Sequence, residues 1–350
     1  MLNTEFCRTE ILIDWLQLYG VNHDFSSQLF EYKHKIYGTK HFNDITEIYY
    51  LSEKVAELAY NPRSRILKSN TVILKIDNKT LYANNLEYVL NLIITHLKID
   101  IISITRVDLA CDFPKLSNSM NPEKFINKFL QNKILKIGRG HFKVVGTQKK
   151  INSYEYLRFG SNTSDVSVYM YNKSKELNEV KNKPYIRDNW KWYKNKQQSW
   201  QSYDTWRLEF SLKSTKLSFI YNDTGEVIPV NISTVLNPFT RSFIFSSLLD
   251  HYFYFVHNNG KSHKIRMRKC PILNILETPG IIYKENNSSE SGRMQKIFIR
   301  MLEEFNCENR KKNKELSELG SEVLEGYLSK YDMKAWKNLK LGEKLNFETN

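Results

Sequence analysis

Acidic, basic and tyrosine side chains recur at every second position in three segments of this sequence. In each segment they alternate with apolar residues, which is typical of a strand that buries one face and presents the other. The polar members are Arg106, Asp108 and Asp112 in the first segment, Tyr169 and Tyr171 in the second, and Arg207 and Glu209 in the third. If these faces converge, carboxylate oxygens suited to Mg²⁺ or Mn²⁺ would lie near a phenolic hydroxyl.

This set of side chains predicts attack by a tyrosine on phosphorus. A phenol titrates near 10, so about one part in a thousand is ionised at pH 7, and attack needs a base or a nearby positive charge. The expected metal ligands are Asp108, Asp112 and Glu209, with Asp14 as a further candidate. The expected sources of positive charge, besides the metal, are Arg106, Lys173 and Arg207. Each carboxylate could equally be the structural ion-pair partner of a neighbouring arginine, and spacing alone leaves both interpretations open.

Strands backed by helices must position these side chains. Alternation and apolar runs predict strands over Glu10–Tyr19, Thr71–Ile76, Thr80–Tyr82, Ile104–Phe113, His141–Val145, Tyr154–Phe159, Asp165–Tyr171 and Thr205–Leu212. The second and third of these would form a hairpin around Asn78. Helical spacing predicts helices over Glu47–Ala59, Leu86–Ile99 and Asn121–Asn132. The pattern predicts an α+β fold, an antiparallel sheet with helices packed on one face.

The character of the chain changes after Leu217. The stretch from His257 to Lys269 carries five Lys or Arg residues and no acid, and two helices are expected at Met294–Phe305 and Lys314–Tyr331. We therefore expect a catalytic domain over residues 1–217. A basic, mainly helical region for DNA binding or an accessory role is expected over residues 218–350.

The charge of the chain favours a polyanionic partner. It has 52 Lys plus Arg against 38 Asp plus Glu, a net charge of +14, and nucleic acid is the commonest polyanion. From Lys181 to Trp200, six cations are interleaved with five aromatic rings, which suits phosphate neutralisation and base stacking. A solvated loop is the alternative. The expected DNA-binding residues are Lys181, Lys183, Arg187, Trp190, Lys191, Trp192, Lys194, Lys196, Lys264, Arg266 and Arg268.

Several other classes of protein are disfavoured. No uncharged apolar run is long enough to span a membrane, and the charges of Glu5, Arg8, Glu10 and Asp14 do not suit a signal peptide. The four cysteines form no CxxC pair, so neither a zinc ribbon nor a redox motif is supported. We expect a cytoplasmic protein with no membrane partner.

Taken together, three segments resemble, in order and spacing, those of the replication initiation factor family. They are TRVDLACD (Thr105–Asp112), RFGSNTSDVSVYMYNKSKE (Arg158–Glu176) and WRLEFSL (Trp206–Leu212). The segment ILIDWLQL around Asp14 also resembles the opening strand of that family. The family comprises rolling-circle initiators of small Gram-positive plasmids and relaxase-like proteins of conjugative transposons. The resemblance covers roughly residues 10 to 215.

The resemblance implies a fold related to rolling-circle nicking domains. It also implies a metal-dependent endonuclease that nicks one strand at a replication origin through a covalent phosphotyrosine and later rejoins it. The matched positions are Arg106, Asp108, Ala110 and Asp112 for R-x-D-x-A-x-D, Gly160, Ser161 and Ser164 for the G-S-x-x-S turn, Tyr171 to Lys173 for Y-N-K, and Arg207 and Glu209 for R-x-E. Position 169, often arginine in the family, is a tyrosine here. Tyr171 is thus the expected nucleophile and Tyr169 the alternative.

The partners implied are double-stranded origin DNA, single-stranded DNA and a host helicase, with a homodimer as one state of assembly. A relaxase for conjugative transfer fits the same resemblance. Two functions from other classes remain open: a non-catalytic DNA-binding regulator that keeps the fold and the basic surface, and a metal-dependent nuclease that attacks with water. The regulator would form no covalent adduct, and the nuclease would release free 5′-phosphates.

Overall fold

The computed structural model describes residues 10–23, 27–64, 67–138, 141–146, 154–161, 164–180, 182–190, 204–213, 218–221, 227–260, 263, 266–273 and 281–284. The chain divides into two compact units, residues 1–286 and 287–350, and all described residues belong to the first. Within the described residues no helix is both long and apolar enough to cross a bilayer.

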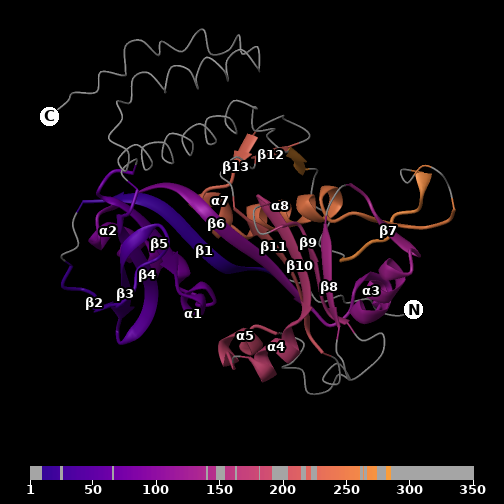
Figure 1. The fold of residues 1–350 in the computed structure, drawn as a ribbon, viewed down its shortest axis with the longest axis horizontal. Coiled ribbons are helices and arrows are strands. Elements are labelled where there is room, and N and C mark those ends of the chain that lie inside the picture. Colours follow the sequence, from indigo (N-terminus) through magenta and orange to yellow (C-terminus); the bar gives the residue numbers. More distant parts are fainter. Residues whose placement is uncertain are drawn as a thin grey trace, which may run out of the picture. The chain divides into compact units, whose positions relative to one another are not determined.

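A ten-stranded antiparallel sheet organises the first unit (Figure 1). Its strands are β1 (Ile11–Asn22), β2 (Glu31–His34), β3 (Phe42–Tyr50), β4 (Glu53–Pro62), β5 (Thr71–Ile76), β6 (Ile99–Phe113), β8 (Phe142–Gly146), β9 (Tyr154–Phe159), β10 (Val166–Asn172) and β11 (Trp206–Leu212). Their order across the sheet is β2-β3-β4-β5-β1-β6-β11-β10-β9-β8. The three strands that carry the predicted chemistry, β6, β11 and β10, are therefore direct neighbours.

Smaller elements surround this sheet. The helices are α1 (Asn78–Leu81), α2 (Leu86–His96), α3 (Pro122–Leu130), α4 (Lys173–Glu179), α5 (Pro184–Asp188), α7 (Ile232–Leu236) and α8 (Pro238–His251), with a 3₁₀ turn at Ser117–Ser119. β7 (Ile134–Lys136) pairs with β14 (Phe255–His257). A further sheet has the order β13 (Val227–Pro229), β12 (Ser218–Tyr221) and β15 (Ile281–Lys284). The architecture is an α+β fold, as expected, but the helices do not lie on one face alone, since α7 and α8 lie on one side of the sheet and α4 and α5 on the other (Figure 1).

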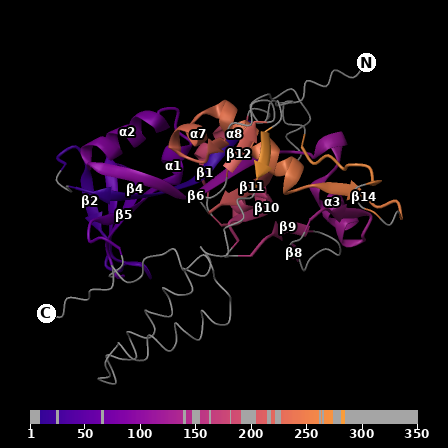
Figure 2. The same cartoon turned by 90° about the horizontal axis from the view of Figure 1, so that it is seen from above.

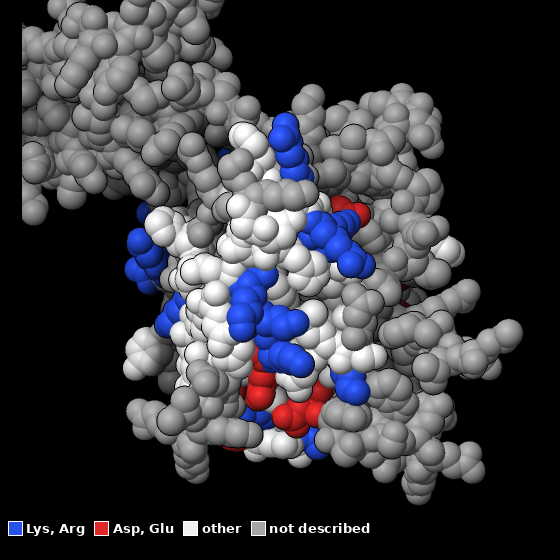
Figure 3. Space-filling model, turned by 90° about the vertical axis from the view of Figure 1, so that its right-hand side faces the viewer, with Lys and Arg blue, Asp and Glu red and all other residues white. Residues whose placement is uncertain are grey.

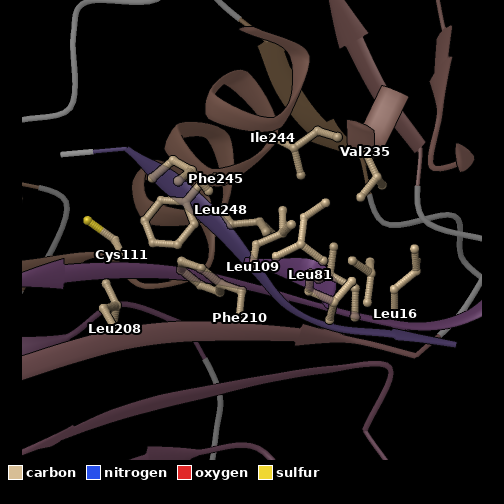
Figure 4. Close-up of a cluster of buried hydrophobic side chains, with 14 of the residues drawn as sticks. Leu16, Leu81, Leu109, Cys111, Leu208, Phe210, Val235, Ile244, Phe245 and Leu248 are labelled. Atoms are coloured by element: carbon tan, nitrogen blue, oxygen red, sulfur yellow. The ribbon is translucent and has the colours of Figure 1, made fainter. Parts of the chain in front are cut away.

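The main core lies between the apolar face of the sheet and α8. Asn237 caps α8 by accepting hydrogen bonds from its first backbone N–H groups, and Pro238 follows as the first helical residue. Phe245 and Leu248 then point at Leu109 and Phe210 (Figure 4), and the rings of Phe210 and Phe245 meet edge to face at 4.9 Å. Both ribbon views place α7 and α8 over the middle of the sheet (Figure 1, Figure 2).

The compact unit does not end near residue 217, where the sequence predicted a domain boundary. The segment after it supplies part of the same core, including Ile244, Phe253 and Cys270. The buried guanidinium of Arg241 also donates from Nε to the carbonyl of Ile11 at 2.7 Å, which ties α8 to β1. The stretch that reads as a separate region is apolar because it packs on the sheet. The helices predicted beyond residue 290 lie outside the described residues.

A predicted helix at Glu47–Ala59 is wrong, because this segment forms the β3–β4 hairpin. Its turn uses Leu51 and Ser52, both with positive φ (50° and 63°). Two-residue hairpin turns of this kind usually contain Asn or Gly, and their absence hid the turn. Ile48 on β3 and Val55 on β4 are both buried, as β-branched residues in strands commonly are.

The predicted hairpin around Asn78 is also wrong in its second strand. β5 forms as expected, but the chain then enters the short helix α1, whose N-cap Asp77 accepts a hydrogen bond from the backbone N–H of Lys79. An aspartate at this position is a helix-start signal. The consequence is that Tyr82 follows a helix and reaches the polar face of the sheet.

Candidate active site

Strand register brings the predicted residues onto one face. The cross-strand rows over β10, β11 and β6 are Tyr171, Arg207 and Asp112, then Tyr169, Glu209 and Ala110, then Ser167, Ser211 and Asp108. Members of successive rows are two residues apart on each strand, so their side chains point the same way. The alternation predicted from the sequence is confirmed.

A β-bulge adds Asp14 to this face. Ile13 pairs with Leu109 and Trp15 with Asp108, so Asp14 is the extra residue of β1. The carboxylate of Asp14 and the ring of Trp15 can then both reach the polar side, although they are consecutive in the chain.

Arg207 lies at the centre of a buried network. It is 0% exposed, and its Nε and Nη2 donate to Oδ1 and Oδ2 of Asp112 at 2.6 and 2.7 Å. Nη1 donates to Oδ1 of Asp14 at 2.6 Å. The indole N–H of Trp190 donates to Asp112 at 2.8 Å, and the hydroxyl of Tyr82 donates to Asp14 at 2.6 Å. We call these five residues the arginine network.

The charge states of this network follow from its contacts. Burial raises the pKa of Asp14, but the charges of Arg207 and Lys173 and the hydrogen bonds from Tyr82 and Arg207 outweigh it, so the pKa lies well below its usual range. Burial lowers the pKa of Arg207, but the negative charges of Asp112 and Asp14 have the larger effect, so the pKa lies well above its usual range. Asp14 and Arg207 are thus both charged at neutral pH.

The carboxylates predicted to hold a metal are divided among other partners. Two of the four bind Arg207. Asp108 accepts a hydrogen bond from Nε of Arg106 at 2.9 Å, and Glu209 accepts one from Tyr171. Across the described part of the chain, no three His, Cys, Asp or Glu side chains form a group that could hold a metal ion. In this arrangement the donors do not fit Mg²⁺ or Mn²⁺, and the metal stays a prediction.

Tyr171 and Glu209 form a polar pair suited to proton transfer. The phenolic hydroxyl donates to Oε2 of Glu209 at 3.1 Å, within the distance expected between a nucleophile and its base. Burial and the charges of Asp108 and Asp14 raise the pKa of Glu209 to about 8. Burial, and then Glu209, raise the pKa of Tyr171 well above 10. At pH 7 most Glu209 side chains are therefore protonated, and Glu209 can accept the proton of Tyr171 only in its ionised fraction, which grows as the pH rises toward 8.

The Y-N-K motif is the junction between β10 and α4. Asn172 is the N-cap of α4, where its side chain accepts a backbone N–H of the first turn, and its Nδ2 donates to Asp204 at 2.7 Å. Lys173 is buried, pairs with Glu176 at 2.6 Å and lies 5.4 Å from the centroid of the Tyr171 ring. The motif thus fixes the tyrosine at the end of a strand.

The G-S-x-x-S motif is the turn between β9 and β10. Gly160 has a φ of +88°, and a Cβ there would lie 2.9 Å from the carbonyl oxygen of Val166. The backbone N–H of Ser161 donates to Oγ of Ser164 at 2.9 Å, and Oγ of Ser167 donates to the carbonyl of Ser161 at 3.0 Å. These residues hold the turn rather than contribute a reactive group.

Tyr169 occupies a different environment from Tyr171. It pairs with Arg158 of β9, whose Cζ lies 5.1 Å from the centroid of its ring. The Tyr156 ring is 6.3 Å away. The guanidinium of Arg158 on the neighbouring strand thus lies next to Tyr169, the position that is often arginine in the replication initiation factor family.

Comparison with known proteins does not assign this chain to a family. Neither a family model nor a curated protein matches this chain. One solved structure that is similar is described as a rolling circle replication initiator protein from Geobacillus stearothermophilus. It has a TM-score of 0.43 and 12% identity, and the match covers 75% of this chain and 92% of that one. A TM-score of this size does not establish a common fold.

The basic loop is partly within the described residues, and one prediction there is wrong. Trp190 is 2% exposed and bonds to Asp112, so it cannot stack on bases; its packing with Leu177 and Ile186 explains the burial. Lys183 donates to Asn78 at 2.8 Å and Arg187 donates to Asn178. The predicted DNA contacts outside the described residues are Lys181, Lys191, Trp192, Lys194, Lys196 and Lys264.

Arg266 and Arg268 are exposed beside β14. β14 pairs with β7, which α3 contacts. Lysines at least partly exposed on α3 and β7 and in the turn between them are Lys124, Lys128, Lys133 and Lys136. Lys and Arg side chains gather on this side of the molecule (Figure 3). The predicted contacts Arg266 and Arg268 thus belong to a wider basic surface, which suits a phosphate backbone.

The raised pKa of Glu209 predicts a pH-dependent loss of stability. This carboxyl ionises near 4.5 in the unfolded chain but only near 8 in the folded protein, so folding is penalised increasingly as pH rises through that window. Glu209→Gln cannot ionise. We expect it to be more stable than the wild type by about 1–3 kcal/mol at pH 8. At about pH 4 the two should be equal.

Urea denaturation at the two pH values measures this difference. A stability difference that is the same at both pH values would show that folding does not shift the pKa of Glu209.

Proposed function

We propose that this chain nicks one DNA strand through a covalent tyrosine and later rejoins it, as rolling-circle initiators do. The observation that carries the proposal is the placement of three motifs on one face of β6, β11 and β10, with Tyr171 hydrogen-bonded to Glu209. The motifs resemble the replication initiation factor family, and the register makes neighbours of residues that are far apart in the chain.

The chemistry follows from the pair of side chains. Glu209 takes the phenolic proton as the oxygen of Tyr171 forms a bond to phosphorus, and the P–O bond to one neighbouring nucleotide breaks. The leaving oxygen takes up the proton that Glu209 has accepted and becomes a free hydroxyl, which returns Glu209 to its ionised form. The phosphotyrosine conserves the energy of the broken bond, so a strand hydroxyl can later attack it and release the tyrosine.

A gel assay tests the proposal. Labelled single strands that tile the DNA around the gene would be incubated with the protein, with and without Mn²⁺, and separated under denaturing conditions before and after protease treatment. We expect a protein–DNA adduct that protease removes. Cleavage that leaves free 5′-phosphates and no adduct would instead show a nuclease that attacks with water.

One observation favours a second candidate, a DNA-binding regulator without catalysis. Three of the four acidic residues predicted as ligands are bonded to arginines, as they would be in a purely structural role. This candidate predicts DNA binding with no cleavage, and full biological function of a Tyr171→Phe variant.

A further inference from the structure

The positive charge nearest Tyr171 is already neutralised. Arg207 is bonded to two carboxylates, and Lys173 is paired with Glu176. A DNA phosphate that enters this face brings its own negative charge into a partly buried region, where an uncompensated charge is costly. The phosphates beside the one under attack must therefore find donors elsewhere on the face.

Arg158 has unused donors at the required place. Its Nε and Nη2 are buried and have no hydrogen-bond partner among the described residues, although the side chain also interacts with Tyr156. It stands on β9, opposite Tyr169 on β10. A buried donor without a partner destabilises the fold, and more so when it is charged. Such a group in a native fold calls for a missing ligand, an ion or water.

Two further cations stand near Arg158. Lys213 directly follows β11, and its backbone N–H donates to the carbonyl of Asp165 at 2.8 Å. Partial burial and the nearby charges of Arg106 and Arg158 lower the pKa of Lys213. Arg106 lies with Cζ 4.4 Å from the centroid of the Trp15 ring. Arg106 is paired with Asp108, so Arg158 and Lys213 are the cations of this group that the pair leaves uncompensated.

We propose that Arg158, with Lys213, binds a backbone phosphate of a single DNA strand next to the phosphate that Tyr171 attacks. This inference rests on the proposed function. Tyr169 and Tyr171 are two residues apart, about 7 Å along β10. That separation is within reach of the phosphate one nucleotide away. The ring of Tyr169 beside Arg158 would then offer a surface on which a base can stack.

Salt-dependent binding tests the proposed phosphate site. The probe is a labelled oligothymidylate, and Tyr171→Phe is the background for all proteins, so cleavage cannot contribute. Arg158→Gln should bind at least about tenfold more weakly, the effect of one charge-assisted hydrogen bond. The slope of log affinity against log salt should become less negative by about 0.7. Lys213→Gln should change the slope in the same direction.

The matched control is Lys68→Gln, which removes one charge from an exposed lysine between β4 and β5. Its slope and affinity should equal those of the parent. Arg158→Lys keeps a charge and should retain the slope, which separates phosphate binding from a packing role. Unchanged slopes in both Arg158→Gln and Lys213→Gln would overturn the site, even if the wild type forms the adduct. If the slopes change but the wild type forms no adduct, the proposed function is wrong and the phosphate site is still supported.

Discussion

Replacement of Arg207 by methionine is expected to lower the free energy of unfolding by about 3–5 kcal/mol, as when one partner of a buried ion pair is removed. Arg207 is 0% exposed and lies between Asp14 and Asp112. Without the guanidinium, the two buried carboxylates keep only neutral donors, which are Tyr82 and Asn78 for Asp14 and Trp190 for Asp112. Urea denaturation followed by tryptophan fluorescence measures the change.

The matched control is Arg63→Met, at an exposed arginine whose Nε donates to the carbonyl of Thr39. It should change stability by less than about 1 kcal/mol. The pKa of Asp14 is lowered in the folded protein, so its contribution is present above about pH 4 and is lost as pH falls. The difference in free energy of unfolding between wild type and Arg207→Met should therefore become smaller as the pH falls below about 4. Equal stabilities at neutral pH would show that the arginine network does not hold the fold.

Tyr171→Phe is expected to reduce adduct formation by more than about a thousandfold, the scale seen when a catalytic nucleophile is removed. The substitution keeps the aromatic ring and deletes only the hydroxyl that donates to Glu209. Tyr169→Phe serves as the matched control, because it deletes a hydroxyl from the same face one row away. It should keep adduct formation within about tenfold of the wild type. The yield of adduct on denaturing gels, measured over time, gives both values.

An adduct that persists in Tyr171→Phe and disappears in Tyr169→Phe would identify Tyr169 as the nucleophile. Tyr169 stands next to Arg158, so the cation beside it would then activate the phenol. Persistence of the adduct in both variants would exclude β10 as the source of the nucleophile.

The sequence predicted those parts of the site whose structure depends on the local pattern of residues. Alternation in β6, β10 and β11 identified which residues share a face, because the period of two is a property of the strand itself. The helices α2 and α3 were predicted for a similar reason, since their apolar spacing is local. The hairpin at Leu51 and Ser52 was missed because it depends on backbone angles that those residue types rarely adopt.

Long-range partners could not be predicted. Nothing near Asp112 in the chain indicates that Trp190 will bond to it, and Tyr82 reaches Asp14 only because α1 replaces the expected strand. Spacing also cannot separate an arginine from a metal ion as the partner of a carboxylate, since either neutralises the same charge. Arg158 lies in a recognisable motif, but only the three-dimensional arrangement shows that its donors are unused.

The most direct test of the central claim is to identify the residue that carries the DNA. Trypsin cleaves after Arg158 and Lys173, so one peptide, Phe159–Lys173, contains both Tyr169 and Tyr171. After nuclease trimming of the adduct, fragmentation of this peptide by mass spectrometry should place a phosphonucleotide on Tyr171. A modified residue outside β10, or cleaved DNA with no modified peptide, would contradict the proposed tyrosine mechanism.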